Sequence, residues 1–187
     1  AGGCRRGDPP GVPAVKTITT KTGIEMVLIP AGEFMMGSPA SELDRSDDEG
    51  PQHRVRITKP FYMGKYEVTQ EQWETVMGSN PSSFRGTKNP VENVSWDDCQ
   101  SLLKKLTVLN PSPFPAGEGW VVRLPTEAEW EYACRAGSTS AYSCGESPSQ
   151  LTAHAWFAEN AGGATHPVGQ KKPNAWGLYD MHGNVAE

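Results

Sequence analysis

Glycine and proline constrain the fold of this chain more than any other feature of its sequence. The 187 residues contain 20 Gly and 16 Pro, and both residue types interrupt regular helices and strands. A helical bundle or a regular doubly wound sheet needs long uninterrupted elements, so both are disfavoured. We expect a single loop-rich domain, because the chain is long enough to bury one sizeable core.

Charge and hydropathy argue against two kinds of partner. The net charge is -5 and the 17 Lys and Arg residues are spread thinly, whereas nucleic-acid-binding domains usually present a basic face. No apolar stretch approaches the roughly 20 residues that cross a bilayer. The longest, residues 26–29, is typical of a buried strand. We therefore expect no nucleic-acid partner and no transmembrane segment.

Apolar and alternating segments predict β-structure early in the domain. Residues 25–30 and 33–37 are predicted as two strands that form a hairpin around Ala31-Gly32. Residues 53–57 alternate polar and apolar side chains as a half-buried strand does, and residues 61–68 continue the β character. Residues 1–22, rich in Gly, Pro, Thr and Lys, are expected to be a flexible lead-in to a domain spanning 23–187.

Three short helices are predicted from capping boxes, in which a hydroxyl accepts a backbone hydrogen bond and a side chain three residues later reaches back. The pairs are Thr69/Gln72, Ser95/Asp98 and Thr126/Glu129. Each helix has an apolar face, and the third is expected to end at Gly137, a residue suited to a C-cap. We interpret the tryptophans on these faces as core residues rather than ligand platforms: Trp73, Trp96 and Trp130.

The four cysteines show no C-x-x-C spacing, so neither a zinc ribbon nor a thioredoxin-like motif is indicated. Cys99 and Cys134 lie on predicted amphipathic helices, where a small buried apolar role is expected. Cys144 lies in a loop and is free to pair with a cysteine elsewhere. Cys4 follows small residues as in a bacterial lipoprotein junction, which would place the protein outside the cytoplasm; the alternative is an ordinary cysteine in an unstructured tail.

Two acidic segments are candidates for metal binding. The loop at residues 38–52 contains Asp44, Asp47, Asp48 and Glu49, and we interpret it as a solvated surface. Asp180 and Glu187 lie seven residues apart around a glycine-containing turn, and calcium readily combines carboxylates with backbone carbonyls. The spacing lacks the pattern of an EF-hand, so local capping or salt bridges are the alternative.

Five segments, in order, resemble the formylglycine-generating-enzyme, or sulfatase-modifying factor, family. The resemblance runs from about residue 24 to the last residue and implies an α+β fold of the C-type-lectin-like kind with little regular secondary structure. The segments are residues 26–38, 66–69, 89–96, 123–135 and 174–185.

Enzymes of this family oxidise a cysteine in a Cys-x-Pro-x-Arg sequence of a sulfatase to formylglycine, using oxygen and copper held by two cysteines. Those cysteines follow the segment that Gly183-Asn184-Val185 resembles, so the resemblance implies a C-terminally incomplete domain. None of the four cysteines matches them, and no catalytic role is transferred. Cys134 resembles a position that forms a structural disulfide in some members. The scattered histidines do not match the iron-binding cluster of related sulfoxide synthases.

The resemblance also implies a calcium site. Its ligands would be a side-chain oxygen of Asp180, the carbonyls of Gly183 and Val185, and the carboxylate of Glu187. A second family site, at Asn160 and the carbonyl of Ala161, lacks its acidic loop and is expected to be lost. Two functions stay open: part of a formylglycine-generating oxidase, or a non-catalytic, calcium-stabilised, lectin-like binding module of an exported or surface protein.

Overall fold

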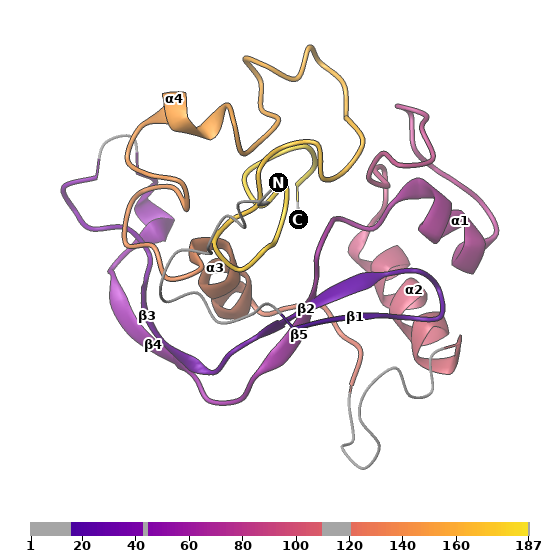
Figure 1. Cartoon of the computed structure of the whole chain (residues 1–187), viewed down its shortest axis with the longest axis horizontal. Coiled ribbons are helices and arrows are strands. Elements are labelled where there is room, and N and C mark those ends of the chain that lie inside the picture. Colours follow the sequence, from indigo (N-terminus) through magenta and orange to yellow (C-terminus); the bar gives the residue numbers. More distant parts are fainter. Residues whose placement is uncertain (1–15, 43–44, 110–120, 187) are drawn as a thin grey trace, which may run out of the picture.

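The computed structural model describes residues 16–42, 45–109 and 121–186, and these form an α+β fold with long loops (Figure 1). Cys4, Asp44 and Glu187 lie outside the described residues. The five strands are β1 Thr17–Thr19, β2 Glu25–Ile29, β3 Gly32–Met36, β4 His53–Ile57 and β5 Phe61–Gly64. The helices are α1 Gln70–Met77, α2 Trp96–Leu109, α3 Glu127–Arg135 and α4 Pro148–Leu151, with a 3₁₀ turn at Asp47–Glu49.

The strands form two small antiparallel sheets, β1-β2-β5 and β3-β4. In Figure 1 the β3–β4 pair lies at one end of the molecule and α1 and α2 lie together at the other, with β1, β2 and β5 between them. Val27 and Ile29 of β2 point inward and are buried, which is the two-residue alternation of a sheet with one covered face.

The predicted hairpin of residues 25–30 and 33–37 is wrong, although both strands exist. β2 pairs with β1 and β5, whereas β3 pairs with β4. Only Pro30 and Ala31 separate the two strands. A two-residue hairpin turn needs positive φ angles that proline cannot adopt, so the chain passes from one sheet into the next.

The predicted lead-in at residues 1–22 contains a strand. Thr17–Thr19 form β1, in register with β2 from Thr17 opposite Val27 to Thr19 opposite Glu25. The Thr-rich composition concealed this strand, because an edge strand with one exposed face needs little apolar character. Residues 1–15 lie outside the described part of the chain.

The three predicted helices are confirmed, together with their caps. Thr69 accepts a hydrogen bond from the backbone of Gln72, and Thr126 and Glu129 form the same reciprocal pair. Ser95 and Asp98 exchange the equivalent bonds at the start of α2. The third helix ends one residue earlier than expected, because Ala136 already adopts the left-handed conformation, with φ of 46°.

Two apolar clusters form the core. One joins the sheets to α3 and residues 178–181, and the other joins α1 to α2 around Trp73, Val76, Leu102 and Leu106. Trp73 and Trp130 take the predicted core positions. Trp96 does not: it is 67% exposed. Helical periodicity assigns a face, but it does not say how far along that face the neighbouring helix extends.

Beyond α4 the described chain continues to residue 186 without another helix or strand. These loops, orange to yellow in Figure 1, lie along one side of the molecule. Leu178 and Met181 anchor them in the core beside Ala133 and Cys134 of α3. None of the described helices is both long enough and apolar enough to span a bilayer.

Candidate functional site

Asp180 is the predicted calcium ligand with the most unusual surroundings. Its side chain is buried, with 2% exposure. Oδ2 accepts a hydrogen bond from the backbone N–H of Gly169 at 2.7 Å, while Oδ1 is buried without a hydrogen-bond partner among the described residues. A buried polar atom of this kind costs about 1–3 kcal/mol, and more when it is charged, so the carboxylate calls for a compensating group.

The electrostatics of Asp180 agree with its geometry. Burial raises the pKa of this carboxyl above its ordinary value, and the Gly169 hydrogen bond and the charge of Lys171 only partly oppose the rise. Two states would relieve the burial: a protonated acid or a carboxylate that contacts a cation. The residue therefore suits a cation site.

The chain around Asp180 forms a tight turn, in which the N–H of Gly183 donates to the Asp180 carbonyl at 3.1 Å. Asp180 itself has a φ of 60°. A Cβ at Gly183 would lie 2.0 Å from the Trp156 carbonyl oxygen, so only glycine fits. The neighbouring Asn184 N–H donates to that same oxygen at 2.7 Å, which locks residues 183–184 against Trp156.

Asn184, which was not predicted as a site residue, is the centre of this loop. Its side-chain oxygen accepts from the N–H of His166 at 2.9 Å, and its nitrogen donates to the His166 carbonyl and to Glu67. Val185 donates its N–H to the other oxygen of Glu67 at 3.1 Å. The backbone of Asn184 and that of Val185, a predicted calcium ligand, are thus held by groups distant in sequence.

The structure brings Asp180, Gly183 and Val185 into one loop, whereas Glu187 falls outside the described residues. Within the described ranges, no three or more His, Cys, Asp or Glu side chains are grouped as metal ligands. A cation here would therefore depend on backbone carbonyls in addition to Asp180, which is the donor set that calcium accepts.

The oxygens of the second implied calcium site are engaged inside their own loop. The side-chain oxygen of Asn160 accepts from the Phe157 N–H at 2.8 Å. The Ala161 carbonyl lies 2.8 Å from Nε2 of His166. His166 in turn stacks on Trp156, with ring centroids 3.9 Å apart. Hydrogen bonds and stacking therefore hold this loop, and the expected loss of the second calcium site stays a prediction.

A groove of about 1140 Å³ runs beside α3, bounded by residues 36–42, residues 45–53, residues 139–148 and His182. Its described lining includes Arg45 and Arg135 and a larger set of carboxylates: Glu42, Asp48, Glu49, Glu127, Glu131 and Glu146. No sequence pattern predicts this groove, because it forms where three segments far apart in sequence meet.

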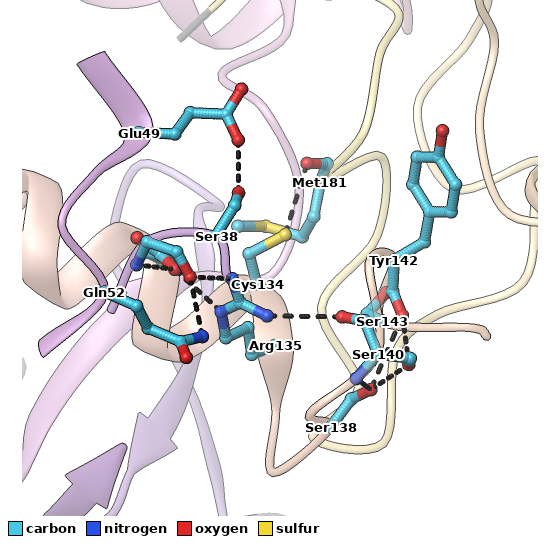
Figure 2. Close-up of polar contacts among 12 residues, drawn as sticks. Ser38, Glu49, Gln52, Cys134, Arg135, Ser138, Ser140, Tyr142, Ser143 and Met181 are labelled. Atoms are coloured by element: carbon cyan, nitrogen blue, oxygen red, sulfur yellow. Dashed lines mark hydrogen bonds and ion pairs between the residues drawn. The ribbon is translucent and has the colours of Figure 1, made fainter. Parts of the chain in front are cut away.

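Charged side chains build the floor of the groove. Glu131 accepts hydrogen bonds from the Gly37 N–H at 2.9 Å and from Arg135 at 2.7 Å. Arg135 also donates to the carbonyls of Gly37 and Ser140. Figure 2 shows Arg135 between the Ser38 segment and the loop that carries Ser138 and Ser140. These bonds fix both walls of the groove to α3.

Cys134 lies at this groove beside His182. Its side chain is buried, its Sγ lies 3.6 Å from the Met181 carbonyl (Figure 2) and 3.7 Å from Nε2 of His182. Because the Ser143 N–H donates to Nε2 at 3.2 Å, this nitrogen is an acceptor and the proton sits on Nδ1. Burial lowers the pKa of His182 to about 4, so the ring is neutral near pH 7 and does not promote a thiolate.

The comparison with known proteins decides the family. The family profile described as the sulfatase-modifying factor enzyme 1-like domain matches residues 12–187. The chain belongs to the sulfatase-modifying factor family. The match begins before residue 23, the predicted start of the domain, and includes β1.

Relatives of this family differ in name. The chain is 38% identical to the chaperone protein LppX of Paenibacillus barcinonensis, over 90% of this chain and 71% of LppX. It is 29% identical to the formylglycine-generating enzyme of Mus musculus, over 87% of this chain but only 57% of that enzyme. The chain thus spans little more than half of the mouse enzyme.

The solved structure of PvdO from Pseudomonas aeruginosa has the same fold. It superposes with a TM-score of 0.76 at 30% identity, covering 91% of this chain and 72% of PvdO. The predicted α+β, loop-rich fold of the sulfatase-modifying factor family is therefore confirmed. Its likeness to C-type lectins stays a prediction.

The described cysteines do not fit the copper site that the sulfatase-modifying factor family implies. Cys99 packs in the α1–α2 cluster, whereas Cys134 belongs to the other cluster, so they do not form a pair. Burial raises the thiol pKa of Cys99 and of Cys144, which disfavours the thiolates that bind copper.

Proposed function

We propose that this chain is a calcium-stabilised, non-catalytic binding domain that holds a polypeptide partner in the groove beside α3. One observation carries the calcium part: the buried Oδ1 of Asp180 lacks a hydrogen-bond partner in the described structure. The polypeptide part rests on the groove and on the similarity to a relative named as a chaperone protein.

Calcium suits Asp180 because it is a hard cation that takes six to eight oxygen ligands, carboxylate or carbonyl. The resemblance to the family supplies the other proposed ligands, namely the carbonyls of Gly183 and Val185 and the carboxylate of Glu187. Bound calcium would neutralise the buried charge of Asp180. The hydrogen bonds of Gly169 and Asn184 would hold the loop in place around it.

Thermal unfolding of the whole chain tests the calcium proposal. A ligand that binds only the folded state stabilises it, by about 2.7 kcal/mol at a hundredfold excess over Kd. We expect calcium to raise the Tm above its value in chelator, with magnesium much less effective because it gives up its waters reluctantly. Identical curves in calcium and chelator would refute the site.

Two alanine variants test where calcium binds. Asp180→Ala should abolish the calcium-dependent rise in Tm. Asp48→Ala is the matched control, because Asp48 is an exposed carboxylate of the acidic loop at residues 38–52 and should leave the rise unchanged. A calcium response lost in Asp48→Ala and kept in Asp180→Ala would move the site to the acidic loop.

The charge of the groove indicates the kind of polypeptide. Six carboxylates and two arginines line its described part, and Glu131 already neutralises Arg135. An extended segment that carries lysine or arginine would complement this charge, and the interaction should weaken as salt is added.

Peptide binding measured by fluorescence anisotropy tests the groove. A labelled Lys/Arg-rich peptide should bind more tightly than an acidic peptide of equal length. Glu127→Gln should weaken its binding, because Glu127 lies at the start of α3 in the groove lining. Glu74→Gln, an exposed glutamate of α1, is the control and should have no effect. Equal binding of the two peptides would contradict the proposal.

A second function is favoured by the family relatives named formylglycine-generating enzymes: the whole protein would oxidise the cysteine of a Cys-x-Pro-x-Arg peptide. The three described cysteines are free and none matches the copper-binding cysteines of the family, so we expect no formylglycine when this chain is incubated with copper, oxygen and such a peptide. Detection of the aldehyde product by mass spectrometry would replace the binding-domain proposal with an enzyme.

A further inference from the structure

Glu67 is a buried acid whose carboxylate contacts the loop of the proposed calcium site from another part of the fold. It follows β5 in the sequence and is only 7% exposed. One oxygen accepts from the side chain of Asn184 at 2.8 Å, and the other accepts from the Val185 N–H at 3.1 Å. Both oxygens therefore hold a segment more than a hundred positions away.

Glu67 and a carbonyl inside the loop accept the same backbone N–H. The N–H of Val185 also lies 3.0 Å from the carbonyl oxygen of Gly183, across a three-residue turn. A carboxylate is a stronger acceptor than a carbonyl. Because Glu67 shares this N–H, the Gly183 oxygen is less fully engaged in its own hydrogen bond. This oxygen is one of the proposed calcium ligands, and it keeps a lone pair for calcium.

The second bond of Glu67 fixes Asn184 in its left-handed conformation, with φ of 71°. The N–H of Asn184 points to the Trp156 carbonyl. Since the N–H and C=O of a trans peptide point in opposite directions, the Gly183 carbonyl is turned away from Trp156. Glu67 and Trp156 together thus determine where this carbonyl points.

We infer that Glu67 is a positioning residue for calcium: it orients the backbone at Gly183–Val185 and adds buried negative charge beside the loop, without being a ligand itself. This inference rests on the calcium site proposed above. Groups that orient metal ligands typically change metal affinity 10- to 100-fold when removed. The same range is expected here.

Isothermal titration with calcium separates this role from a general effect on stability. In Glu67→Gln the amide nitrogen faces one of the two donors, so one hydrogen bond is lost, and we expect calcium affinity to fall 10- to 100-fold. Val76→Ala, in the α1–α2 cluster, lowers stability without touching the loop and should bind calcium as the wild type does.

Glu67→Asp separates geometry from charge. The shorter side chain keeps the charge but moves the carboxylate away from Asn184 and Val185. A positioning role predicts weaker calcium binding, whereas a purely electrostatic role predicts unchanged calcium binding. Wild-type affinity in both Glu67 variants would overturn the inference. Failure of the wild type to bind calcium would instead refute the proposed site.

A measurement on the wild type keeps the inference testable if the variants do not fold. In a calcium titration followed by amide NMR, the signals of Asn184 and Val185 should shift together with that of Asp180. A response at Asp180 without any response at Asn184 and Val185 would overturn the role of Glu67.

Discussion

The α1–α2 pair and the loops after α4 are two regions of one fold that are held together by different interactions. In the helix pair, Trp73, Val76, Leu102 and Leu106 bury apolar surface against each other. In the loops, the side chain of Asn174 makes four hydrogen bonds: it donates to the carbonyls of Ala133 and Cys134 and accepts from the N–H groups of Trp176 and Leu178.

This difference shows how a chain so rich in glycine and proline keeps a fixed structure. Apolar packing is non-directional and depends mainly on buried area, whereas the loops depend on particular donors and acceptors at fixed positions. A buried carboxylate with one unpartnered oxygen, Asp180, lies in the second region and not in the first. We therefore expect the two regions to respond differently to calcium.

The largest effect is expected in the helix pair. Trp73→Ala removes a side chain that is 3% exposed, and truncation of a buried aromatic residue costs about 3–5 kcal/mol. Chemical denaturation should show this loss equally in calcium and in chelator. A loss of stability that depended on calcium would contradict the expectation that the two regions respond differently to calcium.

Asn184→Ala should cost about 2–3 kcal/mol, because it removes a hydrogen bond to the buried Glu67 and places alanine at a positive φ. Unlike the Trp73 variant, it should also reduce the stabilisation that calcium provides. Denaturation curves with and without calcium measure both effects. An equal response of the two variants to calcium would contradict the comparison.

Glu129→Gln tests a polar contact that does not depend on calcium. Arg123 holds the pKa of Glu129 at about 2, below its ordinary value of 4.5, through bonds of 2.6 and 2.7 Å. The carboxylate thus stabilises the fold fully above about pH 4.5, and this contribution is lost as the pH falls toward 2. We expect a loss of about 1–2 kcal/mol at pH 7 that disappears at low pH in urea titrations.

The effect of Asp180→Asn on stability should change sign when calcium is added. In chelator at pH 7 it removes a buried charge whose pKa is raised by burial, so the variant should be more stable by about 1 kcal/mol. In calcium the wild type should gain more than the variant, since asparagine keeps an oxygen ligand but not the charge. A variant less stable than the wild type in chelator would show that another group already compensates Asp180.

The smallest effect is expected at the cap of α2. Ser95→Ala removes the hydroxyl that accepts from the Asp98 N–H, and loss of such a cap costs about 1 kcal/mol. Thermal unfolding should give the same decrease with and without calcium. A larger decrease would mean that the start of α2, including the exposed Trp96, contributes more than its local hydrogen bonds.

The sequence predicted α1 to α3 and β2 to β5 well, because their signals are local, whereas β1 and α4 were not predicted. Thr69 and Thr126 begin helices through contacts with residues three positions later, so a short stretch of sequence contains the whole cause. Trp96 and the β2–β3 connection were misassigned, since each depends on which distant element covers it. The periodicity of a segment does not show which distant element packs against it.

The candidate site was predictable only in part. Asp180, Gly183 and Val185 are close in sequence and could be grouped through the family resemblance. Glu67 could not, because its hydrogen bonds to Asn184 and Val185 join segments more than a hundred positions apart. The groove beside α3 was missed for the same reason.

Hydrogen–deuterium exchange of the wild type, in calcium and in chelator, tests the central claim most directly. If calcium stabilises the polar loops, exchange should slow in residues 166–186 and around Glu67. The amides of α1 and α2 should be unaffected in the native state. Uniform protection of both regions, or none at all, would contradict a calcium site in the Asp180 loop.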